Sequence, residues 1–321
     1  MTFTTYKRLI FLFAFVLLCG QAASVSAQLG GLGGLGDKLK KKVPNPLGDK
    51  QPITTSLPDA KWGDASTDGF TPREAQRSLM TLQRTPNGGF VLQTGYYSMQ
   101  VQSYCLKAGT HGPGGGAGYL YAPPKGPAED AVMTIVRNSV NRPEIPQSKI
   151  QMLLWAIIAR AKFEDLSSDL KATASQLLTP RQLAGLNRSA LDVLHGNALT
   201  DALGGVPAPL RQIAQAEAQL RQMLTSANGS FAEMERVAVL SGNAPLGEGS
   251  IDVPSGRWSI HPDGYYVRYI PSSYSSTRVE IWVPQGNPSV GKEFDPAAHI
   301  AVPGNTARQR LIQSGRAQQQ Q

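Results

Sequence analysis

The sequence predicts an α+β protein, in which a helix-rich main domain with a short antiparallel β element precedes a small C-terminal all-β hairpin module. Three observations lead to this class. Apolar residues recur at helical spacing through much of the segment 148–240. Aromatic and β-branched residues gather in 90–94 and 97–106, which predicts two strands. Residues 276–283 alternate between apolar and polar side chains, which predicts another strand near the C-terminus.

Five helices are expected in the main domain. Two of them begin with a capping residue, a proline at the first helical position and a Glu or Gln that bonds back to the cap. The others are predicted from an acidic first turn or from an apolar face. The predicted helices are Thr71–Arg84, Ala128–Ser139, Ser148–Phe163, one that starts at Thr179, and Leu210–Leu224.

The boundaries follow from changes in composition. The main domain is expected over 61–245 and the β module over 246–305. A hairpin turn is predicted at His261–Gly264, because strand-like segments flank the dipeptide Asp263-Gly264. Residues 306–321 are polar and rich in glutamine, so we expect a disordered tail that frays from the module.

Residues 1–27 have the features of a secretory signal peptide. Lys7 and Arg8 precede an uninterrupted apolar run, which is shorter than the ~20 residues that span a bilayer. Small residues at Val25–Ala27 suit cleavage, which would leave Gln28 as the new N-terminus. An uncleaved anchor is the alternative, and a lipoprotein at Cys19 is disfavoured by the large residue before it. We therefore predict export to the periplasm, the cell surface or the medium.

The charge of the chain excludes one class of partner. The formal net charge is +8, and removal of Lys7 and Arg8 leaves 8 − 2 = +6. Half of this charge lies at 28–58, within a Gly/Leu/Lys-rich linker that is predicted over 28–60. The remainder has no basic patch with interleaved aromatic residues, so no nucleic-acid partner is expected. The linker is predicted to be a disordered spacer, with weak membrane contact through its leucines and lysines as the alternative.

Cleavage of the leader removes one of the two cysteines and leaves Cys105. A single cysteine cannot form an internal disulfide, although the predicted compartment is oxidising. The glycine run Gly112–Gly118 lacks the Lys-Ser/Thr of a phosphate-binding loop, and the scattered histidines lack metal-ligand spacing. We therefore expect neither a cofactor nor a metal, and Cys105 is the residue whose chemistry needs an explanation.

Two short motifs suggest a partner for this cysteine. Tyr104-Cys105-Leu106-Lys107 is followed, 151 − 105 = 46 residues after the cysteine, by Ile150-Gln151 and then Leu154-Trp155. This order resembles the paired motifs of bacterial surface thioester domains. The resemblance implies that the Cys105 and Gln151 side chains join as an internal thioester, which binds an envelope or surface partner covalently. The partner would be a protein or a polysaccharide.

Tyr104, Lys107, His111 and Trp155 are the candidate binding residues around this pair. Lys107 or nearby helix amides would favour the thiolate, and the two aromatic side chains would exclude water. The chain would then be an adhesive protein, and an enzyme is the less favoured class.

Two alternatives remain open. In the first, the chain is a non-catalytic structural or binding protein of the envelope, in which Cys105 is an ordinary buried residue. Gln151 would then complete a capping box with Ser148 at the start of its helix. In the second, the chain is a hydrolase that pairs Cys105 with a histidine base. The candidate bases are His111, His195, His261 and His299.

Overall fold

The computed structural model describes residues 51–60, 64–191, 201, 203–226 and 229–318. The predicted signal peptide, residues 28–50 of the predicted linker and His195 lie outside this part of the chain. Ile53 and Thr55, near the end of the predicted linker, are buried, and Ile53 belongs to the hydrophobic core.

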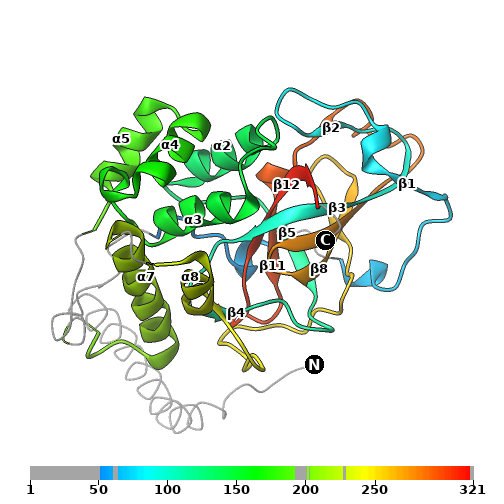
Figure 1. Ribbon diagram of the computed structural model, residues 1–321. Coiled ribbons are helices and arrows are strands. Elements are labelled where there is room, and N and C mark those ends of the chain that lie inside the picture. Colours follow the sequence, from blue (N-terminus) through cyan, green and yellow to red (C-terminus); the bar gives the residue numbers. More distant parts are fainter. Residues whose placement is uncertain (1–50, 61–63, 192–200, 202, 227–228, 319–321) are drawn as a thin grey trace, which may run out of the picture. The chain divides into compact units, whose positions relative to one another are not determined.

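The largest element of the architecture is a β-sheet of eight strands (Figure 1). Seven of them follow one another in the order β5-β11-β12-β3-β9-β8-β7, and neighbours in this order are antiparallel. The eighth, β1, pairs with β3 in parallel. The strands of this sheet are β1 (Gln76–Ser78), β3 (Gly95–Cys105), β5 (Tyr119–Ala122), β7 (Ser259–Ile260), β8 (Tyr266–Ser273), β9 (Ser276–Val283), β11 (Ile300–Pro303) and β12 (Leu311–Ala317).

The sheet curls until it is nearly closed. Its two edge strands approach each other, and the backbone N–H of Tyr121 in β5 donates a 3.0 Å hydrogen bond to the hydroxyl of Ser259 in β7. Two small sheets lie outside it: β2 (Phe90–Val91) pairs with β10 (Glu293–Phe294), and β4 (Thr110–His111) pairs with β6 (Val239–Leu240). The long strand β3 lies centrally, because it joins β12 to β9.

Six α-helices lie within the described residues, and they gather beside the sheet (Figure 1). Of these, α2 and α3 pack on β12 and β3, and α7 and α8 contact α3 in turn. The helices are α2 (Glu129–Ser139), α3 (Gln147–Ile158), α4 (Ser168–Leu177), α5 (Pro180–Arg188), α7 (Ala208–Ser226) and α8 (Phe231–Ala238).

The predicted fold class is therefore wrong. The protein is mostly β, and its largest element is the eight-stranded sheet rather than a helix-rich main domain. The predicted hairpin around His261–Gly264 exists as β7 and β8, and the predicted strand at 276–283 is β9. However, β9 pairs with β3 along eight residue pairs, from Gly95↔Val283 to Gln102↔Ser276. The hairpin is thus part of one sheet with the strands of the predicted main domain. Short sequence windows cannot show this, because the paired strands are far apart along the chain.

The predicted tail also needs correction. Leu311–Ala317 forms β12, an interior strand of the sheet, and its first five residues are buried. Gln313 and Ser314 are polar, but the Ser314 hydroxyl donates a 3.1 Å hydrogen bond to the carbonyl of Gln102. Polar composition suggested fraying, whereas strand pairing satisfies the backbone of this segment.

Capping signals predicted helices unevenly. Thr179 and Gln182 form the expected capping box at the start of α5, with Pro180 at the first position. The same signal failed at Thr71, where the chain instead enters the short strand β1. The pairing of β1 with β3 overrides the local preference, because tertiary contacts contribute more than a cap, which stabilises by only ~1 kcal/mol.

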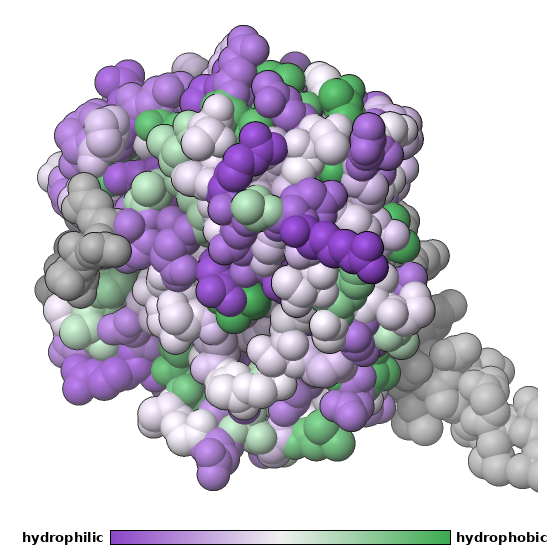
Figure 2. Space-filling model, turned by 90° about the vertical axis from the view of Figure 1, so that its right-hand side faces the viewer, coloured by the Kyte–Doolittle hydropathy of each residue, from purple (hydrophilic) through white to green (hydrophobic). Residues whose placement is uncertain are grey.

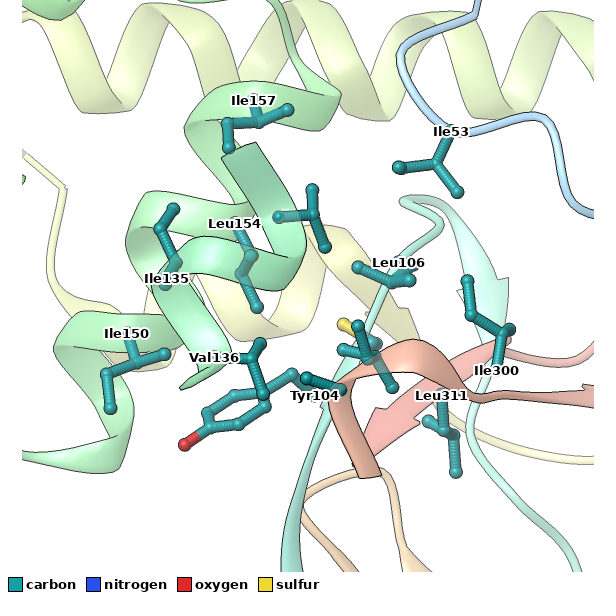
Figure 3. Packing of buried hydrophobic residues seen from close by; sticks show 14 of the residues in the cluster. Ile53, Tyr104, Leu106, Ile135, Val136, Ile150, Leu154, Ile157, Ile300 and Leu311 are labelled. Carbon is teal, nitrogen blue, oxygen red and sulfur yellow. The ribbon is translucent and has the colours of Figure 1, made fainter. Parts of the chain in front are cut away.

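The core lies between the sheet and the helices. Tyr104 and Leu106 at the end of β3 approach Val136 of α2 and Leu154 of α3 (Figure 3). Trp155 is 0% exposed and belongs to the same cluster. On the face that Figure 2 shows, hydrophobic residues are scattered among polar ones. None of the helices in the described part of the chain has the length and apolarity that crossing a membrane requires.

Candidate functional site at the end of strand β3

Cys105 and Gln151 meet inside the protein. Cys105 is the last residue of β3, Gln151 lies in the second turn of α3, and both are buried. The Cys105 N–H donates to Oε1 of Gln151 at 2.9 Å, and Nε2 of Gln151 donates to the Cys105 carbonyl at 3.1 Å. The carboxamide therefore pairs with the backbone of Cys105 through two hydrogen bonds.

The register of the sheet explains this pairing. Strand β9 begins at Ser276, opposite Gln102, so β3 extends past the end of its neighbour. Backbone groups on that edge would lack partners in a buried place, which is costly. Two glutamines of α3 supply them: Gln147 donates to the Ser103 carbonyl at 3.1 Å, and Gln151 serves Cys105. The spacing fits, because four helical residues rise ~6 Å and two strand residues rise ~6.8 Å.

The proposed cap role of Gln151 is therefore wrong. α3 begins at Gln147, its N-cap is Pro146, and that cap makes no side-chain hydrogen bond. The amide of Gln151 points to the strand instead of the helix start, since both of its polar atoms bond Cys105.

The sulfur of Cys105 lies against an aromatic wall. Nε1 of Trp155 donates to Sγ at 3.1 Å, and the indole stacks on Phe231 of α8 with ring centroids 5.4 Å apart. Burial raises the pKa of the Cys105 thiol to about 12, which outweighs the opposite effect of the Trp155 hydrogen bond. The negative charge of Glu235 raises this pKa further. The resting thiol is thus protonated and is a poor nucleophile.

A polar cleft reaches the glutamine from outside. It has a volume of about 370 Å³. Gln151 lines it, whereas Cys105 is not among its lining residues. The cleft is also lined by Ser103, Tyr104, Gln147, Ser148, Phe231, Glu235, Tyr274 and Ser275. A molecule in this cleft would meet the carboxamide before the thiol.

Tyr104 and Trp155, two of the four candidate binding residues, lie at this site. Trp155 contacts the sulfur directly. Tyr104 lines the cleft and is 0% exposed, and its hydroxyl donates to Oε1 of Gln102 at 3.1 Å. Burial raises the pKa of Tyr104 to about 12, so this hydroxyl stays protonated.

The other two candidates make contacts elsewhere. Nζ of Lys107 donates to the carbonyl of Thr306 at 3.2 Å, and burial lowers the pKa of this amine to about 8. Its charged neighbours are Arg310 and Glu217. His111 lies in β4, where its backbone bonds Ala307 and Gln309. Neither side chain lines the cleft. No hydrogen bond among the described residues joins Lys107 to the Cys105 sulfur, so the predicted role of Lys107 in forming the thiolate is not supported.

Of the candidate histidine bases, the three that the structure describes, His111, His261 and His299, are not hydrogen-bond partners of the Cys105 thiol. The indole N–H of Trp155 is the group that donates to Sγ. His299 is buried between two tyrosine hydroxyls, and His261 stacks on it with ring centroids 5.0 Å apart. The contacts that a cysteine hydrolase requires are thus not seen for these two histidines.

Sequence reasoning missed four residues of the site. Gln147 had a signal, because it is spaced four residues from Gln151 on one helix face. Phe231, Glu235 and Tyr274 had none, since they come from segments at least 80 residues after Gln151, 231 − 151 = 80. Only the tertiary fold brings them to the cleft.

No group of three or more His, Cys, Asp or Glu side chains within the described residues is arranged to hold a metal ion. Comparisons with protein families, with curated proteins and with solved structures found no match to this chain. The function must therefore be argued from the geometry of the site.

Proposed function

We propose that this chain is an exported protein of the cell envelope or surface, which binds a protein or polysaccharide partner covalently through an internal thioester between Cys105 and Gln151. One observation carries the proposal: the Gln151 carboxamide lies directly against the Cys105 backbone, in an interior where both residues are at most 1% exposed. A buried acceptor carbonyl beside a lone cysteine is what thioester formation requires.

Formation is a balanced exchange of one bond for another. Sγ of Cys105 adds to Cδ of Gln151, and the bond between Cδ and Nε2 breaks. The thiol proton joins the departing NH₂ group, so ammonia leaves and a C–S bond remains. Neither an oxidant nor a reductant is needed.

The backbone of Cys105 supports this step at two points. Its N–H already donates to Oε1 at 2.9 Å, so it is placed to stabilise negative charge that develops on that oxygen. Its carbonyl accepts from Nε2 at 3.1 Å and so holds the leaving nitrogen. The sulfur must leave the Trp155 indole and turn toward Cδ.

Capture of a partner reverses the same chemistry at the carbonyl carbon. An amine or hydroxyl in the cleft attacks Cδ, the C–S bond breaks, and the proton of the nucleophile passes to sulfur. The product is an amide or ester to the partner and a free Cys105 thiol. Because Gln151 is 1% exposed, water reaches this carbon poorly until a partner opens the cleft wall.

A second candidate is a non-catalytic envelope protein. It is favoured by a specific observation: Gln147 and Gln151 complete the hydrogen bonds of the buried end of β3 that extends past β9, which is a sufficient structural reason for both residues. The raised pKa of the Cys105 thiol also suits an inert buried cysteine. The two candidates differ in covalent mass, so they can be separated.

The intact mass of the purified exported chain tests the proposal. We expect cleavage after Ala27 and a mass lower by one ammonia than the mature sequence requires. Cys105→Ala and Gln151→Ala should each restore the full mass. Gln147→Ala removes the hydrogen bonds to the Ser103 and Ser275 carbonyls but leaves both thioester residues in place, so it should keep the deficit. Methylamine should convert the deficit into a methylamide and free one thiol. A full mass with a thiol that labels on unfolding would instead support the non-catalytic protein.

A further inference from the structure

We propose that Glu235 is the acid–base residue of this thioester chemistry and that Tyr274 is its positioning residue. The inference rests on the proposed function and adds a proton carrier to it. It starts from a requirement of the chemistry: the thiol must lose its proton, and the leaving amide nitrogen must gain one. A group that carries the proton from the sulfur to the nitrogen would accelerate the exchange.

Glu235 lies near Cys105 and Gln151 because four elements meet at this point: β3, α3, α8 and the turn between β8 and β9. Helix α8 packs on α3 through the stack of Phe231 on Trp155, which is the indole that contacts Sγ. Glu235 lies one helical turn after Phe231 and lines the same cleft as Gln151. The turn between β8 and β9 closes the cleft from the sheet side and contributes Tyr274.

This turn is hydrogen-bonded to β3 and to α3, which carry Cys105 and Gln151. The Ser103 hydroxyl donates to the Tyr274 carbonyl at 3.0 Å, and Gln147 donates to the Ser275 carbonyl at 2.7 Å. The Tyr274 hydroxyl donates to Oε1 of Glu235. The carboxylate is therefore oriented by a tyrosine whose backbone is bonded to the end of β3. Oε2 of Glu235 has no hydrogen-bond partner among the described residues.

Glu235 is also the chemically suitable group in the cleft. The cleft has three titratable lining residues, namely Tyr104, Glu235 and Tyr274, and no Lys, Arg or His. Burial raises the pKa of both tyrosines, so neither is a base near neutral pH. The negative charge of Glu235 raises the pKa of the Cys105 thiol. The negative charges of Glu235 and of the ionised Cys105 both raise the pKa of Tyr274. The geometric link runs through helix α8: Phe231, one turn before Glu235, stacks on the indole that donates to the sulfur.

The proton follows a closed path. Glu235 takes the proton from Sγ as the sulfur attacks Cδ of Gln151, and it gives the same proton to Nε2 as ammonia departs. When a partner attacks, Glu235 takes the proton from its amine or hydroxyl and returns it to sulfur as the C–S bond breaks. The carboxylate is regenerated after each stage.

The test uses the full exported chain and the isosteric variant Glu235→Gln. Two quantities are measured: the fraction of chain with the ammonia deficit, and the rate at which methylamine frees the thiol as pH is varied. We expect a lower fraction and a rate reduced ~10²-fold or more, because general acid–base groups contribute 10²–10⁴-fold. In the natural chain the rate should fall as the carboxylate is protonated in acid, and in Glu235→Gln this acidic limb should vanish.

Three further variants make the result specific. Glu248→Gln removes an exposed carboxylate outside the cleft and should behave as the natural chain does. Tyr274→Phe keeps Glu235 but removes the hydroxyl that orients its carboxylate, so a smaller rate loss with a shifted acidic limb is expected. Glu235→Asp should keep an acidic limb, which a purely structural glutamate would not predict, and it replaces Glu235→Gln if the latter fails to fold.

The outcomes separate the two proposals. A natural chain with the ammonia deficit and a Glu235→Gln variant with equal deficit, rate and pH profile would overturn the role of Glu235 and leave the thioester standing. A natural chain of full mass would overturn the thioester, and the role of Glu235 with it.

Discussion

Two buried regions of this protein contain unusual side chains, and they differ in what surrounds them. At the end of β3, one thiol, two carboxamides and one carboxylate lie at or beside a polar cleft. Inside the curled sheet, His261 and His299 lie among the rings of Tyr121, Tyr265 and Tyr269. The second region holds more titratable groups than the first.

The difference lies in hydrogen-bond satisfaction and access. Nε2 and Nδ1 of His299 contact the hydroxyls of Tyr265 and Tyr269 at 3.1 and 3.2 Å, and the ring is 2% exposed. Burial lowers the pKa of His299 well below its usual value, so the ring is neutral. The cluster is internally complete, whereas the β3 region presents a carbonyl carbon and a carboxylate to a cleft. A concentration of ionisable residues therefore indicates a site only where a second molecule can reach it.

The largest effect on stability is expected from a change of Trp155, the aromatic residue that contacts the Cys105 sulfur at the end of β3. Trp155→Ala removes a fully buried indole, and we expect the free energy of unfolding to fall by ~3–5 kcal/mol. The sulfur also loses its hydrogen-bond donor and its cover, so water should hydrolyse the thioester and abolish the ammonia deficit. Denaturant unfolding and intact mass measure the two consequences.

Trp155→Phe is the matched control for this change. It keeps an aromatic ring against Phe231 and loses only the N–H, so it should cost less stability and retain part of the deficit. If Trp155→Ala had the same intact mass and the same stability as the natural chain, it would contradict this account. The Trp155 indole would then contribute neither to the free energy of unfolding nor to protection of the thioester.

A smaller effect is expected at the histidine cluster, and it depends on pH. The folded-state pKa of His299 is lowered, and that of His261 is lowered to about 4, mainly by burial. Below pH ~6.5 the unfolded chain therefore binds protons that the folded chain does not, so stability falls as pH drops from ~6.5 toward 4. The slope is at most ~1.4 kcal/mol per pH unit for each histidine.

The difference in pH dependence between the natural chain and His299→Gln isolates this contribution. Other groups, such as the buried Glu217, whose pKa burial raises to about 7, act in the opposite direction but equally in both chains. His299→Gln should have the shallower acid slope and an unaltered ammonia deficit. Loss of the deficit in this variant would show that the two regions are not independent.

Local signals predicted individual elements well and their assembly badly. Alternation predicted β9 at Ser276–Val283, and the capping box predicted the start of α5. The strand β12 was missed because its interior carries polar residues that only the neighbouring strand satisfies. The sheet as a whole depends on pairs such as Tyr104↔Ile312, which join residues some 200 positions apart, 312 − 104 = 208. No local pattern encodes such pairs.

The site was predictable to the same extent. Cys105 and Gln151 could be named from two short motifs, and the fold brings them together through hydrogen bonds. Lys107 was misjudged because it lies past the end of β3, where its amine turns to Thr306. Glu235 and Tyr274 could not be named, since their place depends on α8 packing on α3 and on the turn between β8 and β9.

The most direct test of the central claim is to find the bond itself. The natural chain is digested at mildly acidic pH without thiols, and the peptides are sequenced by tandem mass spectrometry. The account predicts one cross-linked species that joins the peptide containing Cys105 to the peptide containing Gln151, with one ammonia missing, and predicts its loss after methylamine treatment. Recovery of the two peptides only as separate species, with an intact carboxamide on Gln151 and a free thiol on Cys105, would contradict it.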